Sequence, residues 1–176
     1  MQHKRATRTV GDLVLFSMLG SLMYLSKLLM EGLPNIHLVG VLTVAITLVY
    51  RTRALIPLYV FVLLAGLFQG FSPWWTPYLY VWTVLWGATM LLPRRIPRRL
   101  RPVIYSLVCG LHGLLFGTLY APVQALLFGL TAEGMLAWIA AGLTFDLIHA
   151  AGNFTLGLLI LPLSELLFRL ERRRSV

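Results

Sequence analysis

Apolar residues form six long runs along the chain, which are separated by charged residues or by proline and glycine. The runs lie at about 12–31, 36–50, 54–71, 75–92, 103–128 and 135–168. They do not alternate with polar residues as the strands of a membrane barrel do, so the pattern predicts helices. The expected fold is an all-α membrane protein, a compact bundle of six transmembrane helices in a single domain over residues 1–176.

Composition supports this prediction and excludes an ordinary soluble domain. Of the 176 residues, 59% are hydrophobic and 12% are charged, and the mean hydropathy is +0.82. A single cysteine, Cys109, excludes an internal disulfide and a multi-cysteine metal site. The first apolar run has no small-residue cleavage site after its basic start, so we interpret it as a retained helix and not as a signal peptide.

Charge gives the expected orientation. The formal net charge is +9, and nearly all of the basic residues gather in four clusters between the apolar runs. The clusters are Lys4/Arg5/Arg8, Arg51/Arg53, Arg94/Arg95/Arg98/Arg99/Arg101 and Arg169/Arg172/Arg173/Arg174. The connectors 31–35, 71–77 and 130–134 contain no lysine or arginine. The positive-inside rule therefore predicts cytoplasmic N- and C-termini. The expected location is a bacterial plasma membrane.

The last run carries three polar residues where lipid-facing residues are expected. Asp146, His149 and Asn153 lie at positions i, i+3 and i+7, so they share one face of a helix. Ionisable groups at membrane depth are costly, by about 2.5–3.5 kcal/mol for aspartate on insertion scales, and normally face the protein interior. Two interpretations stay open: a structural network between helices, or a site for a ligand or transported substrate.

Other polar and aromatic residues can join such a site. Tyr120 and Gln124 lie four residues apart in the outer half of the fifth run and share a face, whereas His112, taken alone, is more typical of packing. Trp75, Tyr78 and Trp82, at i, i+3 and i+7, form either an interfacial aromatic belt or a wall on which a flat heterocycle stacks.

The connector after the first run adds two further candidates. Lys27 lies four residues before Glu31, which suggests either an ion pair that satisfies itself or a cap over a cavity. Asn35 and His37 follow the turn. The second run is short for a span, so the connector 31–35 is expected to occupy membrane depth and line a cavity.

Small residues mark two places where helices can approach closely. Gly110, Gly113 and Gly117 predict such an approach in the fifth run. In the first run, Ser17 and Ser21, with Gly20 beside them, form a stripe for contact with another helix of the chain or with a partner subunit. There is no GxxxxGK[ST], HExxH or GxSxG motif, so the sequence does not predict nucleotide hydrolysis or an enzyme.

Together, these features resemble the substrate-binding S components of energy-coupling factor (ECF) transporters. The resemblance covers the whole chain. It consists of six helices in under 200 residues, a cytoplasmic N-terminus, a proline in the first outer connector, an aromatic outer end of the fourth helix, and the late segment DLIHAAGN. It lies in the layout more than in any one motif.

The resemblance implies a function and partners. S components bind a vitamin or another micronutrient in an occluded outer pocket formed by the first outer loop and helices 4, 5 and 6. They deliver it with a membrane coupling subunit and two cytoplasmic ATPase subunits, which hydrolyse the ATP. A helix-1 AxxxA stripe often contacts the coupling subunit, and Ser17 and Ser21 lie at the matching place. The metal-transporting members need an outer N-terminal histidine; His3 lies among the inner charges, so a metal substrate is not expected.

The expected site combines these candidates. Asp146, His149, Asn153, Tyr120, Gln124, Trp75, Tyr78, Trp82, Asn35 and Lys27 are the predicted substrate-binding residues, and Ser17, Gly20 and Ser21 the predicted partner-binding residues. No cofactor or nucleic acid is expected. Two alternatives stay open: an intramembrane enzyme that uses His112, Asp146 and His149, with or without a metal, and a solitary proton-coupled carrier with Asp146 and His149 as its relay.

Overall fold

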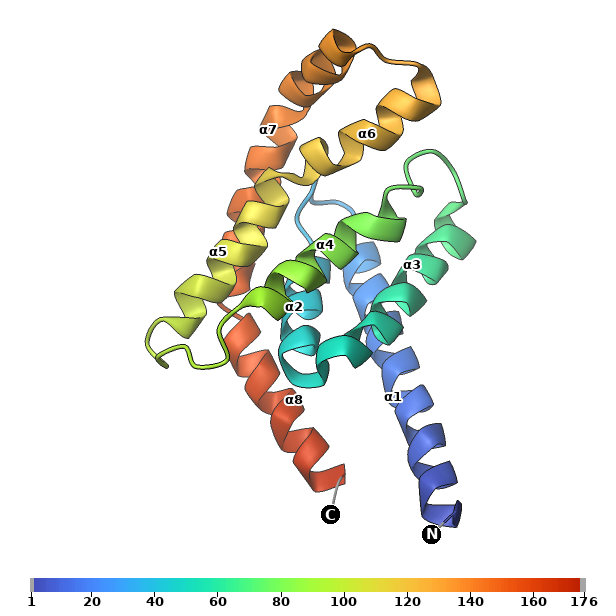
Figure 1. The fold of residues 1–176 in the computed structure, drawn as a ribbon, viewed down its shortest axis with the longest axis vertical. Helices are drawn as coiled ribbons and strands as arrows, with labels where there is room; N and C mark the ends of the chain where they lie inside the picture. Colours follow the sequence, from blue (N-terminus) through green and yellow to red (C-terminus); the bar gives the residue numbers. More distant parts are fainter. Residues whose placement is uncertain (1, 175–176) are drawn as a thin grey trace.

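The computed structural model describes the backbone of residues 2–174 and the side chains of residues 10–174, and this part of the chain contains helices and no strand (Figure 1). The elements are α1 (Gln2–Leu29), α2 (Val39–Tyr50), the 3-10 helix η1 (Arg51–Ala54), α3 (Leu55–Gln69), α4 (Tyr78–Leu91), α5 (Arg101–Leu114), α6 (Phe116–Phe128), α7 (Ala132–Gly157) and α8 (Ile160–Arg174). The all-α prediction is confirmed.

Each predicted run is helical, but several boundaries were wrong. The helix predicted from 75 begins only at Tyr78, because residues 72–77 form turns that end at Pro77. The predicted fifth run is divided at Leu115 into α5 and α6, and the sixth is divided after Gly157 into α7 and α8. The last helix also continues to Arg174, beyond the predicted end at 168. Hydropathy does not detect these breaks, because the residues at each break are themselves apolar.

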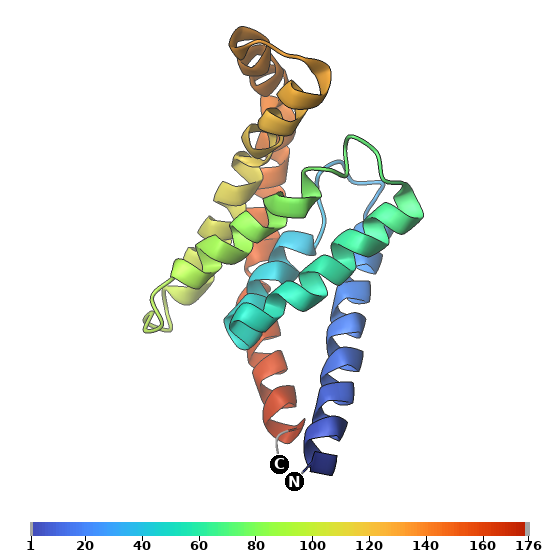
Figure 2. The ribbon, with the colours of Figure 1, turned by 45° about the vertical axis from the view of Figure 1, so that its right-hand side comes forward.

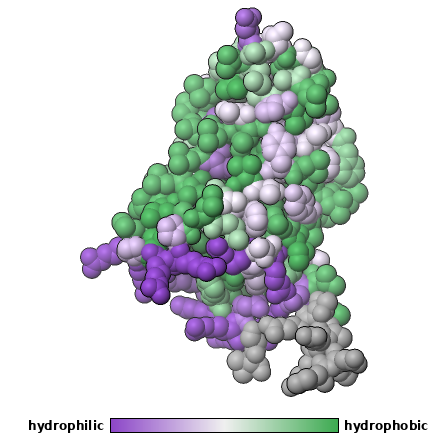
Figure 3. Space-filling model, in the orientation of Figure 1, coloured by the Kyte–Doolittle hydropathy of each residue, from purple (hydrophilic) through white to green (hydrophobic). Residues whose placement is uncertain are grey.

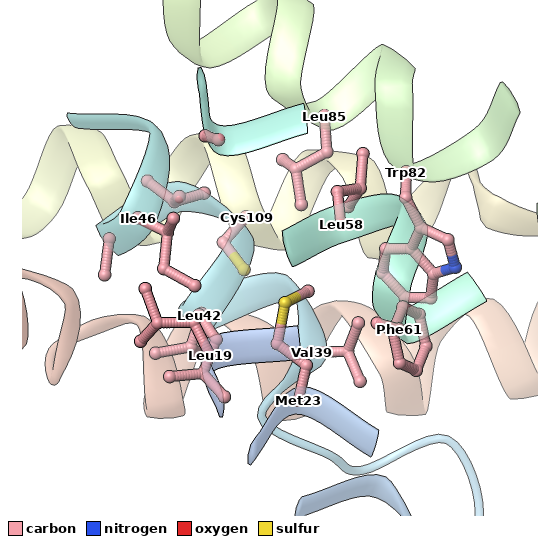
Figure 4. Packing of buried hydrophobic residues seen from close by; sticks show 14 of the residues in the cluster. Leu19, Met23, Val39, Leu42, Ile46, Leu58, Phe61, Trp82, Leu85 and Cys109 are labelled. Atoms are coloured by element: carbon pink, nitrogen blue, oxygen red, sulfur yellow. The ribbon is translucent and has the colours of Figure 1, made fainter. Parts of the chain in front are cut away.

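Helix α2 forms the centre of the bundle. It packs against α1, α4, α5, α7 and α8, and every residue from Val39 to Thr47 is buried. Figure 4 shows its side chains between those of α1, α3, α4 and α5. The two threonines of this helix, Thr43 and Thr47, donate their hydroxyls to the carbonyls of Val39 and Thr43, at 2.8 and 2.6 Å. The Tyr50 hydroxyl donates to Glu171, so α2 buries no unpaired hydroxyl.

Helices α5 and α7 pack in close contact through glycine, as the sequence predicted. A Cβ added at Gly113 would lie 2.9 Å from the carbonyl carbon and oxygen of His149, and one at Gly110 would lie 3.3 Å from the Ala150 carbonyl oxygen. A side chain at Gly113 would therefore force the two backbones apart. This close approach sets the register between α7, which carries the polar face, and the α5–α6 segment.

The molecule has two chemically distinct ends. The two chain ends, η1 and the α4–α5 connection lie at one end, and the α1–α2, α3–α4 and α6–α7 connections lie toward the other (Figures 1 and 2). In Figure 3, hydrophilic residues form a band near the first of these ends, below a largely apolar surface. We call it the basic end, and the other the opposite end. The arrangement agrees with the predicted topology, whose orientation in a membrane stays a prediction.

Four helical stretches within the described residues are long and apolar enough to cross a membrane: Val10–Leu29, Val39–Gln69, Arg101–Phe128 and Ala132–Gly157. This is the pattern of a multi-pass membrane protein. The second stretch is a hairpin, because the chain reverses where Arg51 has a φ of +53°. Its arms, α2 and α3, have 12 and 15 residues and so extend only about 18 and 22 Å at 1.5 Å per residue.

Candidate functional site

A cavity of about 210 Å³ lies under the connection between α1 and α2, at the opposite end. We call it the histidine cavity. It is lined by Lys27, Met30, Glu31, Leu33, Pro34, Asn35, Ile36, His37, Tyr78, Phe116 and His149. The connector 31–35 thus lines a cavity, as the shortness of the second run predicted. Its residues meet α4, α6 and α7 there, although they are far apart in the sequence.

Two histidines from different elements meet in this cavity. The rings of His37 and His149 lie 5.1 Å apart between centroids. Neither His149 nitrogen has a hydrogen-bond partner among the described residues, and the same holds for Nδ1 of His37. His149 is 1% exposed. Because more than nine-tenths of buried polar groups in proteins are hydrogen-bonded, nitrogens in this state mark a place suited to a polar ligand.

Aromatic rings form the wall behind the histidines. Phe116 lies 4.7 Å from the His149 ring and 4.9 Å from the Tyr120 ring, and Trp82 lies 5.7 Å from the His37 ring. Trp82 is fully buried, and its indole Nε1 has no partner in the described chain. The Phe116–His149 and Trp82–His37 pairs are edge-to-face, which is favourable for aromatic rings at these separations. The wall thus combines apolar faces with a few polar edges.

Lys27 lies at the rim of the cavity. Its ammonium group donates to the Gln69 side-chain oxygen at 2.8 Å and lies 5.8 Å from the centre of the Trp74 ring. Among the described side chains it forms no ion pair with Glu31, so the self-satisfied pair is not present. Lys27, Glu31 and Tyr78 also line a neighbouring cavity of about 300 Å³ that includes Gln69 and Trp74. The rim therefore connects two adjacent spaces.

His37 lines the cavity two residues before the apolar span Val39–Gln69 begins. Burial, and secondarily the positive charge of Lys27, lowers the pKa of His37 from 6.5 to about 4. His37 is therefore neutral at physiological pH. One nitrogen of a neutral imidazole accepts a hydrogen bond and the other donates one, so the ring can recognise either kind of group on a ligand.

Asp146 faces inward as predicted but does not line the histidine cavity. Both of its carboxylate oxygens accept from the backbone N–H of Gly117, at 3.0 and 3.1 Å. The break at Leu115 starts a new helix, whose first N–H groups have no intrahelical acceptor. Asp146 therefore acts as a cap supplied by another helix, where a negative charge also interacts favourably with the helix dipole. This geometry supports the structural interpretation of Asp146.

Asn153 also points into the bundle and away from the cavity. Its side-chain nitrogen donates to the Cys109 carbonyl at 3.3 Å, which joins α7 to α5, and its oxygen has no partner among the described residues. A Cβ on Gly40 would lie 3.3 Å from this side-chain nitrogen, so α2 covers the amide closely. Of the three polar residues on the α7 face, His149 alone reaches the cavity.

The other predicted binding residues divide between the cavity and the packing around it. Tyr78 and Asn35 line the cavity, and Trp82 lies behind it. Trp75 instead donates its indole N–H to the Val62 carbonyl at 2.8 Å, and so fixes the α3–α4 connection on α3. Gln124 is half-buried on α6 and lines neither of the two adjacent cavities.

Tyr120 supports the wall from α6. Its hydroxyl donates to the Trp74 carbonyl at 2.9 Å, and its ring packs on Phe116. It therefore ties α6 to the connection before α4, beside the cavity, without lining the cavity itself.

The three small residues of α1 face two different directions. A Cβ on Gly20 would lie 2.6 Å from Val60 and 2.7 Å from the Pro57 carbonyl, so Gly20 packs against α3 of the same chain. Ser17 and Ser21 instead line an apolar groove of about 870 Å³ between α1 and α8, with α2 at its floor. We call this the α1–α8 groove. The side chain of His3 lies outside the described side chains.

Sequence reasoning missed Phe116 and gave little weight to His37. Phe116 lies midway between His112 and Tyr120, four residues from each, so the shared helical face could have indicated it. For His37 the available signal was its position directly after the connector expected to line a cavity. His112 donates its Nε2–H to the Val81 carbonyl at 3.0 Å and packs on Trp82 and Phe116, so it supports the wall from behind.

The geometry gives no support to the catalytic and relay alternatives. Among the residues with described positions, no group of three or more histidine, cysteine or acidic side chains is placed to hold a metal ion. Asp146 accepts from Gly117, and His112 uses its Nε2 for Val81, while the Nδ1 of His112 has no partner among the described residues. The arrangement is suited to binding a small ligand, because it offers neutral imidazoles, a cation at the rim and aromatic faces around a small space.

Comparison with protein-family models, with characterised proteins and with solved structures finds no match to this chain. Function must therefore be inferred from the residues and their arrangement.

Proposed function

We propose that this chain is the membrane-embedded, substrate-binding subunit of an ECF-type ABC transporter. In this role it captures a heterocyclic micronutrient of the vitamin class in the histidine cavity, and separate subunits supply the energy. The observation that carries the proposal is the pair His37 and His149. They meet under the first connector in a small cavity, with three imidazole nitrogens that have no partner in the described chain.

The ligand chemistry follows from the lining. A volume of about 210 Å³ is below the roughly 300–1,000 Å³ typical of drug-sized sites, which favours a compound of one or two rings. Phe116 and Tyr78 offer aromatic surfaces for a flat ring, and the histidines offer hydrogen bonds to ring nitrogens or carbonyls. Lys27 at the rim suits an anionic or carbonyl substituent.

The α1–α8 groove supports the second half of the proposal, docking of a coupling subunit. It is lined by apolar residues and the small Ser17 and Ser21, so the backbone of a partner helix can approach α1 closely. Asp12 of α1 forms an ion pair with Arg174 of α8, which joins the two walls of the groove near the basic end, and a second ion pair with Arg53 of η1. The two cytoplasmic ATPase subunits would then bind through the coupling subunit.

Mass spectrometry of small molecules that co-purify with the detergent-solubilised protein tests the ligand. We expect one heterocyclic compound at near-equimolar amount, and its loss in His149→Leu. Ile148→Ala is the matched control, because Ile148 is the preceding residue but 38% exposed on the outside of α7. Loss of the compound in both variants, or its retention in both, would contradict the assignment of the cavity.

Purification of the tagged chain from its native membranes tests the partners. We expect ATP hydrolysis and a second membrane subunit in the eluate, both of which are lost in Ser17→Trp because the indole fills the groove. Leu63→Trp is the control, since Leu63 is an exposed residue of α3 outside the groove. ATPase activity that survives Ser17→Trp unchanged would remove the groove from the interface.

A further inference from the structure

A second cavity, of about 330 Å³, lies at the basic end, far from the histidine cavity. We call it the arginine pocket. It is formed by the end of α2, the α4–α5 connection, the start of α5 and the middle of α8. Its polar lining residues are Arg51, Arg94, Arg101, Tyr105, Ser164 and Glu165. Three arginines from separate segments therefore share one cavity.

Two of these arginines are held in place by the backbone. Arg51 donates from a terminal guanidinium nitrogen to the Met90 carbonyl at 3.1 Å, and its own carbonyl accepts from the Trp86 indole at 3.0 Å. Arg101 donates through Nε to the Ile96 carbonyl at 3.0 Å. Each guanidinium has five N–H donors, so each keeps several for another acceptor. Fixing the side chains in advance lowers the entropic cost of binding an anion.

The backbone of Arg51 shows that this position is unusual. Its φ of +53° lies in the left-handed region, which is uncommon for a residue with a long side chain. Such conformations persist when surrounding contacts hold them, and they concentrate at functional sites. Here the backbone conformation of Arg51 directs its side chain from the turn between α2 and α3 toward α4 and the arginine pocket.

The single acidic residue in the lining has a cationic partner at the protein surface. Glu165 accepts from Arg98 at 3.3 Å, and Arg98 itself lies outside the lining. Arg94 makes no hydrogen bond or ion pair with the described residues. The pocket therefore presents three positive charges against one carboxylate that already has a partner. This excess favours an anion, and guanidinium groups match phosphate oxygens geometrically.

Apart from Tyr105 and Ser164, the remainder of the lining is apolar and continues to the surface. Leu48, Leu92 and Leu161 line the interior, and Phe168 lines the cavity while 48% exposed. Leu91, next to Leu92, is 86% exposed. A small soluble anion would not contact these apolar residues. A phospholipid would, because it carries a phosphate and acyl chains in one molecule. Basic cavities between helices on the cytoplasmic side of membrane proteins bind lipid headgroups in this way.

We propose that the arginine pocket binds the phosphate headgroup of an anionic phospholipid. Arg51, Arg94 and Arg101 contact the phosphate, and the acyl chains lie against Phe168 and the neighbouring exposed leucines. The lipid would join the α4–α5 connection to α8 and fix the basic end at the membrane interface. This inference does not depend on the proposed substrate, because the two cavities share no residue.

Native mass spectrometry in detergent tests the proposal with an equimolar mixture of phosphatidylglycerol and phosphatidylcholine of the same acyl chains. We expect retained phosphatidylglycerol and a loss of that preference by about 10-fold or more in Arg94→Gln/Arg101→Gln. The matched control is Arg172→Gln/Arg173→Gln, which removes the same charge from exposed positions outside the pocket. An equal loss in the control, or no preference for phosphatidylglycerol in the unmodified protein, would overturn the proposal that the pocket binds this lipid.

A second substitution, which removes a negative charge and should strengthen lipid binding, keeps the test valid if the double arginine variant does not fold. Glu165→Gln removes the only acid of the lining and frees Arg98, so phosphatidylglycerol retention should rise about 5-fold. An unchanged or lower retention would contradict the proposal. Glycerol 3-phosphate, which lacks acyl chains, should not displace the lipid at equal concentration; displacement would show that the pocket binds a free phosphate and would overturn the lipid assignment.

Discussion

Two regions of the inner face of α7 lie one turn apart and differ completely in how their polar atoms are bonded. At Asp146 both oxygens accept from the Gly117 amide, whereas three residues later both nitrogens of His149 have no partner among the described residues. Asp146 is 6% exposed and His149 is 1% exposed, so burial does not separate them. The difference lies in what faces each side chain: the start of a helix at Asp146, and a cavity at His149.

The comparison shows that one polar stripe can serve two purposes. A buried carboxylate is very costly unless it is paired, so it must find a donor within the fold. A neutral imidazole with an unmade hydrogen bond costs less, about 1–3 kcal/mol. A ligand that supplies the missing hydrogen bond can offset this cost when it binds. The stripe thus contains a structural residue and a recognition residue side by side.

Replacing the structural member should have the largest effect on stability. Asp146→Ala leaves the Gly117 amide without its acceptor and should destabilise the fold by about 2–4 kcal/mol, because hydrogen bonds to charged groups contribute about 1.5–3 kcal/mol and the deletion adds a small void. The midpoint of thermal unfolding in detergent measures this. Asp146→Asn keeps one acceptor oxygen and should lose about half as much. A normal midpoint combined with lost ligand binding would reverse the roles assigned to the two residues.

Replacing His149 should have the opposite effect, with stability kept and ligand affinity reduced. His149→Leu removes two unpaired buried nitrogens, so the melting temperature should hold or rise, while ligand affinity falls by about 10- to 100-fold. Isothermal titration with the co-purified compound measures the affinity. Unfolding of the variant together with lost affinity would show that His149 is structural, and the contrast with Asp146 would disappear.

Asn153 offers an intermediate test, because its amide is only half satisfied. Asn153→Ala removes the hydrogen bond to the Cys109 carbonyl and should cost about 1 kcal/mol of stability. Ligand affinity should change by less than about 3-fold, since the side chain lies outside the cavity lining. Unfolding and titration experiments on the same preparation give both values. A large affinity loss with unchanged stability would place a ligand contact deeper in the bundle.

The smallest expected effect concerns pH and His37. Its pKa falls from 6.5 to about 4 on folding, so between these values the unfolded chain binds a proton that the folded chain does not. His37 therefore does not reduce the free energy of unfolding above about pH 6.5, and it reduces it progressively as the pH falls toward 4. The drop in melting temperature from about pH 7.5 to about pH 5 should be smaller in His37→Gln than in the unmodified protein. An equal drop would show that His37 does not contribute.

Much of the fold could be predicted from hydropathy and charge alone. Each of the six apolar runs folds as helix, although the fifth and the sixth are each divided in two, because long apolar runs favour a backbone that satisfies its own hydrogen bonds. The spacing of Asp146, His149 and Asn153 placed them on one inward face, and their burial confirms that prediction. Gly110 and Gly113 predicted a close helix contact that α5 and α7 form. These properties are local, so periodicity and residue size are enough to determine them.

The partners of those residues were decided only by the tertiary structure. Periodicity states which way a side chain faces but not what it meets, because that depends on the register between helices and on where a helix breaks. The break at Leu115 exposed the Gly117 amide to Asp146, and the path of the first connector brought His37 over His149. The sequence by itself determined that α7 has a polar inner face; the helix break and the connector decided which part of that face is a cap and which part borders a cavity.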